Sequence, residues 1–293
     1  MYAMLILFLL FFNMFSVFPA FGWSYDHSEL WANTFSNCNF SSQSPVNIQL
    51  AYTTHVDWWE TLEYFNERNN SKVEYFMFIS ESILKVQVHG NFVLNGESLR
   101  ATFYTIQLHF HWRYKSITRG SAHYIDGEGF PLEMHIVNKN FQYSDLTTAI
   151  LHPDGIAIIA FFFEIEPLDN PMLSKIIDVL PDLGSKSMLL KDFSLSGLID
   201  EGLKETDFFQ YNGSIPVPPC NECVIWIIVK KPLSISRRQL EEIWKLSERD
   251  NMLGTNIRPV QPLYERLVWT TFSAADKAIS SACCLLFLTM LCI

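Results

Sequence analysis

The chain has 293 residues, a formal net charge of −10 and 15% aromatic residues. This composition can bury a large core and argues against extended disorder. The acidic balance, with no visible basic stripe, argues against nucleic acid as a partner.

The N-terminus begins with an apolar run, "MLILFLLFFNMFSVF", that ends in the small-residue segment "PAFG". The run is short for a membrane span and ends as secretory leaders do, so residues 1–22 are predicted to be a signal peptide. No Lys or Arg precedes the run, and an uncleaved anchor is the alternative interpretation.

Residues 23–272 contain short strand-like runs separated by turn residues, without an internal repeat or a linker. The run Ile156–Ile165 is apolar on both faces and is expected in the centre of a sheet. The other predicted strands are Ile83–His89, Phe103–His111, Ala122–Ile125, Leu132–Val137, Phe208–Tyr211 and Val224–Val229.

Helices are predicted to be fewer. Ser236 and Gln239 form a capping box before "LEEIWKL", and Met172–Leu180 is expected to be a short helix closed by Pro181. These patterns predict one mostly β (α+β) domain, with a large, mainly antiparallel sheet and helices at its margins.

The C-terminus, residues 273–293, ends in a second apolar run, Ala282–Ile293, which is too short to cross a bilayer as a helix. Small residues from Ser273 onward, a short polar spacer and this tail are typical of a glycosylphosphatidylinositol (GPI) anchor signal, with Ser273 as the attachment site. The alternative is a tail that packs on the domain or stays disordered. The two terminal signals together predict a protein that is secreted or attached to the outer face of the plasma membrane.

The cysteines and glycosylation motifs agree with this route. Three of the six cysteines, Cys38, Cys220 and Cys223, lie outside the tail, and two of them could pair in an oxidising compartment, although spacing does not say which. Asn-x-Ser/Thr acceptors occur at three positions, Asn39, Asn69 and Asn212.

The segment "IQLHFHW" places two imidazoles one residue apart in a strand, so that His109 and His111 share a face. A third imidazole, His135, lies in another strand, "PLEMHIVNK". Gln107 and Glu133 stand two residues before His109 and His135, where they can accept from the second ring nitrogen. Three imidazoles with an open fourth position are the pattern of a catalytic Zn²⁺ site. Core histidines bonded to the backbone are the alternative.

Five motifs together resemble the α-class carbonic anhydrases. They are "QSPVNI" (Gln43–Ile48), "IQLHFHW" (Ile106–Trp112), "EMHIV" (Glu133–Val137), "NECVIW" (Asn221–Trp226) and "RPVQPL" (Arg258–Leu263). The resemblance covers nearly all of the chain after Trp23. It implies a twisted, largely antiparallel sheet of about ten strands, with zinc bound by His109, His111 and His135 at the bottom of a cone. It also implies reversible hydration of carbon dioxide to bicarbonate.

The same resemblance implies roles for further residues. Gln107 and Glu133 would orient zinc-bound histidines, His123 would be structural rather than a ligand, Cys38 would pair with Cys220, and Cys223 would remain a buried free thiol. The apolar pocket for carbon dioxide would map onto Val137, Ile158, Ile215 and Trp226; plain core packing is the alternative for these four.

Three departures from the family pattern concern the chemistry. Where the family has a threonine that orients the attacking hydroxide, this chain has Pro216, which lacks both a hydroxyl and a backbone N–H. The glutamate that pairs with that threonine is replaced by Ala122. Lys72 aligns with the family's proton-shuttle histidine; its ordinary pKa suits a solvated surface charge better than a relay near pH 7.

These departures predict a zinc lyase with weak hydratase activity. A catalytically silent, carbonic anhydrase-related binding module at the cell surface is the alternative, and esterase-like hydrolysis is a third reading.

Overall fold

The computed structural model describes residues 23–57, 62–66, 73–184, 186–204, 207–249 and 255–272. The predicted signal peptide and C-terminal tail lie outside these residues, as do Asn69, Lys72 and Ser273. Among the described residues, none of the helices has the length and apolar character needed to cross a membrane.

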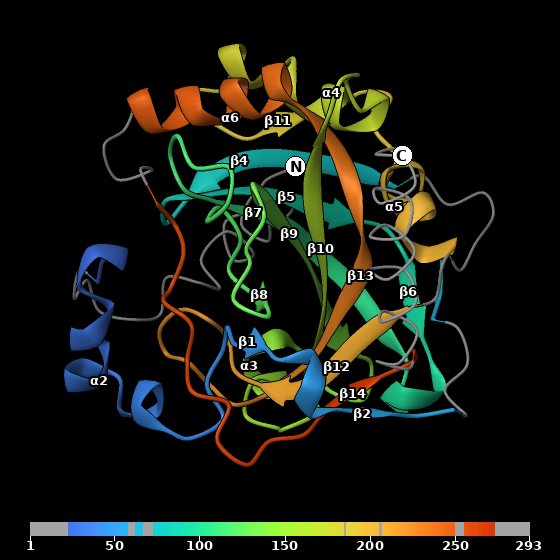
Figure 1. The fold of residues 1–293 in the computed structure, drawn as a ribbon. Helices are drawn as coiled ribbons and strands as arrows, with labels where there is room; N and C mark the ends of the chain where they lie inside the picture. The colour runs from blue at the N-terminus through green and yellow to red at the C-terminus, as the bar shows by residue number, and fades with distance from the viewer. Residues whose placement is uncertain are drawn as a thin grey trace, which may run out of the picture.

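A large mixed sheet dominates the fold (Figure 1). Twelve described strands form it, rather than about ten: β2 (Thr53–His55), β3 (Glu63–Asn66), β4 (Glu74–Ser80), β5 (Ile83–His89), β6 (Phe92–Asn95), β7 (Phe103–Trp112), β9 (Leu132–Asn140), β10 (Ile156–Glu166), β11 (Met188–Leu189), β12 (Phe208–Gly213), β13 (Val224–Ser236) and β14 (Val268–Thr270). Two further strands, β1 (Asn47–Ile48) and β8 (Tyr124–Ile125), pair separately.

The strand order through the sheet is β11-β4-β5-β7-β9-β10-β13-β12-β14-β2, with β3 and β6 off this path. Most pairings are antiparallel, as predicted, but β10 pairs with β13 in parallel and β14 with β2 likewise. The strand β10 lies between β9 and β13 and its first eight residues are buried on both faces. The prediction of a central position for this strand is therefore confirmed.

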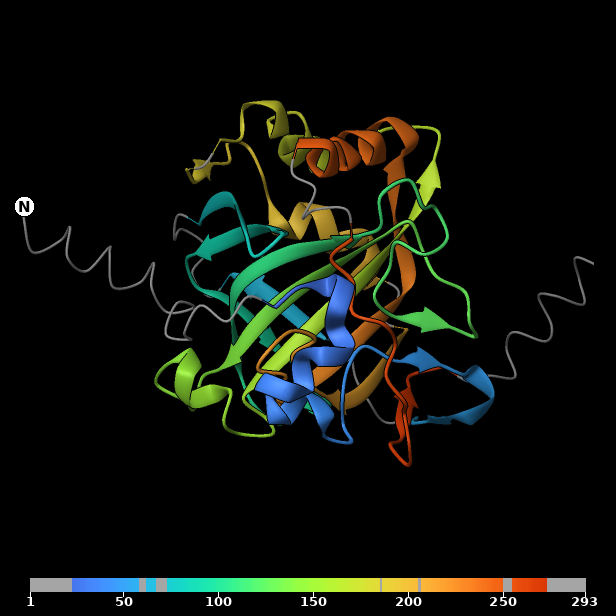
Figure 2. The same cartoon turned by 90° about the vertical axis from the view of Figure 1, so that its left-hand side faces the viewer.

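The helices are short and lie at the margins of the sheet (Figure 2). The α-helices are α2 (Trp31–Thr34), α3 (Leu146–Ala149), α4 (Pro171–Ile177), α5 (Leu195–Lys204) and α6 (Arg237–Arg249). The 3₁₀ helices are η1 (Tyr25–Leu30), η2 (Ser36–Asn39), η3 (Leu50–Tyr52), η4 (Glu97–Leu99) and η5 (Leu180–Asp182). The helix predicted over Met172–Leu180 corresponds to α4, which ends earlier than expected, at Ile177. Pro181 does not close this helix but lies in the following 3₁₀ helix, η5.

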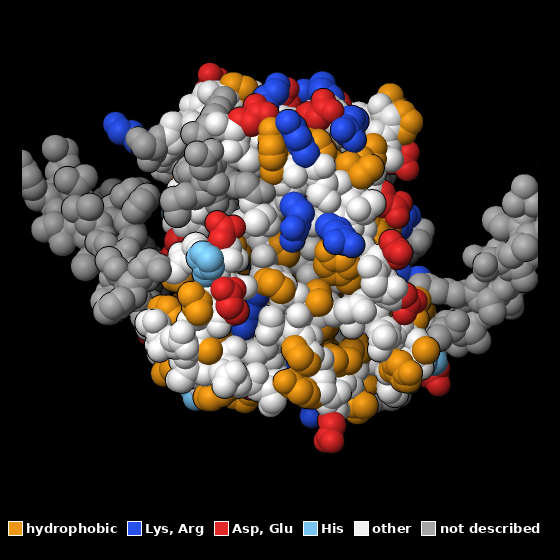
Figure 3. Space-filling model, turned by 60° about the vertical axis from the view of Figure 1, so that its left-hand side comes forward, with side chains coloured by type: hydrophobic (Ala, Val, Ile, Leu, Met, Phe, Trp, Pro, Cys, Tyr) orange, Lys and Arg blue, Asp and Glu red, His pale blue; other side chains and the backbone are white. Residues whose placement is uncertain are grey.

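The capping box of α6 is confirmed. The backbone N–H of Gln239 donates to Ser236 Oγ at 3.0 Å, and the N–H of Ser236 donates to Gln239 Oε1 at 3.1 Å. Leu240 and Ile243 face the core, whereas the charged side chains of α6 contribute to the band of charge along the top of Figure 3.

Two apolar clusters cover opposite faces of the sheet. Leu108 and Phe110 of β7 join the cluster that also contains buried residues of α4, α5 and α6. Val137, Ile158 and Trp226 belong to the other cluster, which also contains residues of β1 and α3. Because side chains alternate along a strand, His109 and His111 point away from α4, α5 and α6, toward the second face.

Candidate metal centre

The three predicted ligands lie on two neighbouring strands in matched register. His109 of β7 is paired with His135 of β9, and His111 is paired with Glu133. Antiparallel partners share a face, so the sheet brings the three imidazoles together without help from a loop. The ring centroids lie 5.0 Å apart for His109 and His111, 5.2 Å for His109 and His135, and 4.4 Å for His111 and His135.

The imidazoles are buried, and at least one nitrogen of each has no hydrogen-bond partner among the described residues. The unpaired atoms are Nδ1 of His109, Nε2 of His111 and Nδ1 of His135. Each residue offers a ligand nitrogen, and these ligand atoms lie within 4.8 Å of one another. Buried polar atoms are ordinarily paired, because leaving one unpaired costs about 1–3 kcal/mol. The cluster therefore fits a metal ion, and three imidazoles are a donor set that zinc accepts.

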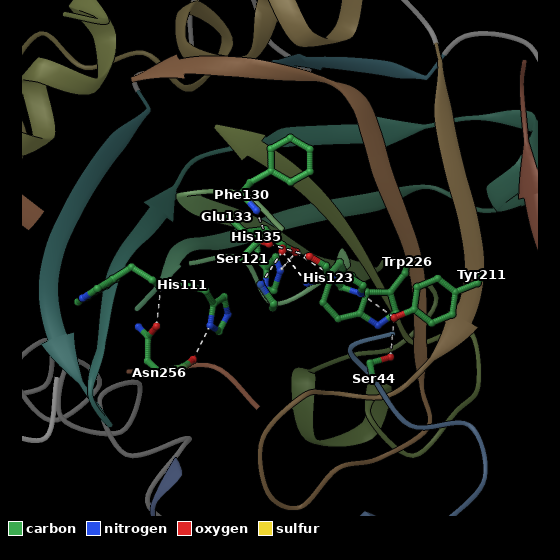
Figure 4. Close-up of polar contacts among 12 residues, drawn as sticks. Ser44, His111, Ser121, His123, Phe130, Glu133, His135, Tyr211, Trp226 and Asn256 are labelled. Atoms are coloured by element: carbon green, nitrogen blue, oxygen red, sulfur yellow. Dashed lines mark hydrogen bonds and ion pairs between the residues drawn. The ribbon is translucent and has the colours of Figure 1, made fainter. Parts of the chain in front are cut away.

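Two of the three rings are fixed by acceptors on their other nitrogen (Figure 4). His111 Nδ1 lies 2.7 Å from the backbone oxygen of Asn256, and His135 Nε2 lies 2.6 Å from Glu133 Oε1. The Glu133 contact is the one expected from the spacing along β9. The hydrogen bond expected between Gln107 and His109 is not seen among the described residues, where His109 Nδ1 has no partner.

Glu133 accepts four hydrogen bonds in a fully buried position. Its Oε1 accepts from His135 and from His123 Nδ1 at 2.7 Å, and its Oε2 accepts from the backbone N–H groups of Ala122 and His123 at 2.8 Å each. His123 Nε2 lies 2.8 Å from the hydroxyl oxygen of Tyr211. Both ring nitrogens of His123 are therefore occupied, which assigns it a structural position although it clusters with Glu133 and His135.

Burial sets the protonation state of the imidazoles. It lowers the pKa of His111 to about 3, with the charge of His135 as the next cause. Burial, followed by the other two imidazoles and Lys85, lowers the pKa of His109 well below its usual range. Burial likewise lowers the pKa of His135. The rings are consequently neutral near pH 7, which is the form that binds a metal.

Glu133 remains ionised in the same surroundings. Burial alone would raise the pKa of this carboxyl, but His123 and His135, by charge and hydrogen bonding, hold it well below its usual range. A buried carboxylate behind a ligand histidine orients the ring and raises its basicity.

The four residues predicted to line an apolar pocket belong to, or pack against, the apolar cluster on the second face of the sheet. Val137, Ile158 and Trp226 are neighbours in register across β9, β10 and β13, and Ile215 packs against the same cluster. The ring centroid of Trp226 lies 4.8 Å from that of His135. Trp226 thus links this apolar cluster to the imidazole of His135.

The two substituted positions are both buried. Ala122 is 2% exposed, and its backbone N–H donates to Glu133. Pro216 is buried in the segment between β12 and β13, where Ile215 N donates to Asn221 O at 2.9 Å.

Cys38 and Cys220 form a disulfide, and Cys223 is a buried free thiol, both as the family pattern implied. Of the predicted glycosylation sites that the structure describes, Asn39 and Asn212 are both exposed.

Three residues that sequence reasoning missed support the site. Asn256 supplies the acceptor for His111, and its side chain also accepts from Trp112 N at 2.8 Å. Tyr211 donates to Ser44 Oγ at 2.8 Å and so extends the chain of hydrogen bonds from Glu133 through His123. Asn256 precedes the "RPVQPL" motif, and Ser44 lies inside the "QSPVNI" motif. Two of the family motifs therefore adjoin or contain residues that make these hydrogen bonds.

Comparisons with known proteins agree with this geometry. The family model described as "Eukaryotic-type carbonic anhydrase" matches residues 26–272. The chain is 29% identical over 267 residues to "Carbonic anhydrase 3" of Bos taurus, an alignment that covers 85% of this chain and 98% of that protein. Enzymes of this family use zinc, and the cluster of His109, His111 and His135 could bind it. The chain belongs to the eukaryotic-type carbonic anhydrase family.

Proposed function

We propose that this protein is a zinc-binding carbonic anhydrase with weak hydratase activity, acting on carbon dioxide and bicarbonate outside the cell. The observation that carries the proposal is the set of three buried imidazoles whose ligand nitrogens lie within 4.8 Å of one another. Zinc, when bound there, supplies a Lewis acid that makes water nucleophilic at neutral pH.

The residues of this chain would do three things for the reaction. His109, His111 and His135 would hold the metal, with Glu133 orienting His135. The wall formed by Val137, Ile158, Ile215 and Trp226 would exclude water and accept an apolar gas molecule.

The predicted weakness follows from what Pro216 and Ala122 lack. Pro216 offers neither a hydroxyl nor a backbone N–H, so it can neither orient the attacking group nor donate to an anion. Ala122 has no carboxylate to receive a proton. Loss of one preorganised group commonly costs about 10²–10³ in rate. Since Ala122 is buried, the simultaneous loss of both polar partners is compatible with a stable fold.

Stopped-flow hydration of carbon dioxide by the purified, zinc-loaded protein tests the activity. We expect a rate at least about 10²-fold below that of an efficient family member under the same conditions. Turnover within tenfold of such an enzyme would contradict the roles given to Pro216 and Ala122.

A silent binding module is the second candidate, favoured by the loss of the same pair. Substitution of His109 by Ala separates the two candidates. A folded His109→Ala protein that keeps its function at the cell surface supports the binding module, whereas loss of that function supports the zinc lyase.

Secretion is proposed on three grounds. A disulfide joins Cys38 to Cys220, Asn39 and Asn212 are exposed, and both terminal sequences resemble secretory signals. If Ser273 carries a lipid anchor, a phosphatidylinositol-specific phospholipase will release the protein from cells. Protein that stays on the cells after this treatment would contradict the anchor.

A further inference from the structure

A lysine lies in register with the metal-binding histidines. Lys85 of β5 is paired with His109 of β7, which is in turn paired with His135 of β9. The three residues therefore form one row on the same face of the sheet, with adjacent Cβ atoms about 5 Å apart. Lys85 is only 6% exposed. A buried ammonium beside imidazoles that hold a dication is unexpected on electrostatic grounds, because the two positive charges repel.

The ammonium group is held by an ion pair with a defined orientation. Lys85 Nζ lies 2.7 Å from Glu81 Oε2, in the turn between β4 and β5. The lysine side chain is 7% exposed, whereas the glutamate side chain is 36% exposed. The cationic end of the pair thus lies toward the protein interior and the anionic end toward solvent.

The effects of the two charged groups on the pKa values of their neighbours agree with this orientation of the ion pair. Lys85 is among the charges that lower the pKa of His109, after burial and the other two imidazoles. Glu81 acts instead on Tyr25, whose pKa is raised first by burial and then by this carboxylate. The hydroxyl of Tyr25 is buried and has no hydrogen-bond partner within the part of the chain that the structure describes. The geometry itself is the register, which places Lys85 on the strand next to His109, and the burial of Lys85, which turns the positive end of the pair inward.

We propose that Lys85 raises the affinity of this metal centre for anions of the bicarbonate and carboxylate class, relative to neutral ligands of the same metal. The inference rests on the zinc site proposed above. Pro216 has no backbone N–H to offer such an anion. Lys85 instead supplies a positive charge from β5, the strand that is paired with β7 and its metal-binding histidines. It is a specificity residue that acts by its charge.

A purely structural role is the competing explanation. Glu81 and Ser82 both have positive φ, 53° and 61°, in the turn that Lys85 follows, and the ion pair could simply stabilise this turn. A structural role predicts lower stability when either partner is replaced, with no change in anion affinity.

The test measures ligand affinity in the cobalt-substituted protein, whose visible spectrum reports ligands on the metal. Acetate is the anionic probe and imidazole is a neutral probe for the same metal. The variants are Lys85→Met, Lys85→Arg and Glu81→Gln. The matched control is Lys230→Met, because Lys230 of β13 forms an ion pair at 2.6 Å with Asp207, which precedes β12.

We expect Lys85→Met to weaken acetate binding about fivefold, a partial charge effect because Glu81 offsets some of the field. Imidazole binding should stay within about twofold of the wild-type value, since a neutral ligand does not sense the charge. Lys85→Arg and Lys230→Met should match the wild type. Glu81→Gln should change acetate affinity in the opposite direction, and this variant decides the question if Lys85→Met does not fold.

Unchanged acetate affinity in a metal-loaded Lys85→Met protein would overturn this inference and leave the zinc site standing. Equal weakening of acetate and imidazole would also overturn it, because that result indicates a distorted site. Failure of the wild-type protein to take up metal would overturn the proposed zinc function, and this inference with it.

Discussion

Glu133 and His135 form the most completely supported contact of the site: His135 Nε2 lies 2.6 Å from Glu133 Oε1, and neither side chain is exposed. The carboxylate is also held by three donors from Ala122 and His123. The imidazole of His135 is therefore oriented by a carboxylate whose own position is fixed by three further hydrogen bonds.

Replacement of Glu133 by Gln should weaken zinc binding by about 10–100-fold, because an amide is a poorer acceptor and points a donor at groups that already donate. Competition with a chromogenic zinc chelator measures the change. The matched control is Glu128→Gln at an exposed position, which should not alter zinc affinity. Wild-type affinity in Glu133→Gln would show that the contact does not orient the ligand.

Reintroduction of the missing polar pair should raise the activity. We expect the double variant Ala122→Glu with Pro216→Thr to hydrate carbon dioxide about 10²-fold faster than the wild type, in the same stopped-flow assay. Neither single change should achieve this, because each leaves its new group without a partner.

The single variant Ala122→Glu should also lose about 1–3 kcal/mol of unfolding free energy, since its carboxyl group would be buried and unpaired. Urea titration measures that loss. A gain of activity from either single change, equal to that of the double variant, would refute the coupling between the two positions.

The capping box of α6 should contribute measurably to stability. Ser236→Ala removes the acceptor for Gln239 N and should cost about 1 kcal/mol in urea unfolding. Ser187→Ala, at an exposed position, is the control. A Ser236→Ala protein as stable as the control would mean that the cap is not energetically significant.

Cys223 should be unreactive in the folded protein. It is 1% exposed, and burial raises the pKa of its thiol to about 12, so very little thiolate forms at pH 8. With a chromogenic disulfide reagent, wild type and Cys223→Ala should release the same amount of chromophore when native and differ by one equivalent in denaturant. A native difference of one equivalent would contradict the burial of this thiol.

The alternation of "IQLHFHW" was sufficient to predict a shared face for His109 and His111, because a strand has a fixed period of two. The same rule placed Glu133 beside His135. The acceptor for His111 could not be predicted in this way, since it is the backbone oxygen of Asn256, which carries no signature in the sequence. The row through Lys85 depends on the register between β5 and β7, which is a property of the folded sheet.

Other differences from the expected fold have local causes. The helix α5 was not predicted, and it contains Gly197 and Gly202, which are weak helix formers. A Cβ at Gly202 would lie 2.8 Å from Phe161 Cε1, so close packing against β10 accounts for that glycine. The strand β13 continues through Lys230, Lys231 and Pro232 to Ser236, beyond the apolar run that marked it in the sequence.

The zinc content of the purified protein tests the central claim most directly. Elemental analysis should find about one zinc per chain in the wild type, and much less in folded variants with Ala at His109, His111 or His135. A wild-type protein without zinc, or triad variants that retain it in full, would contradict the account.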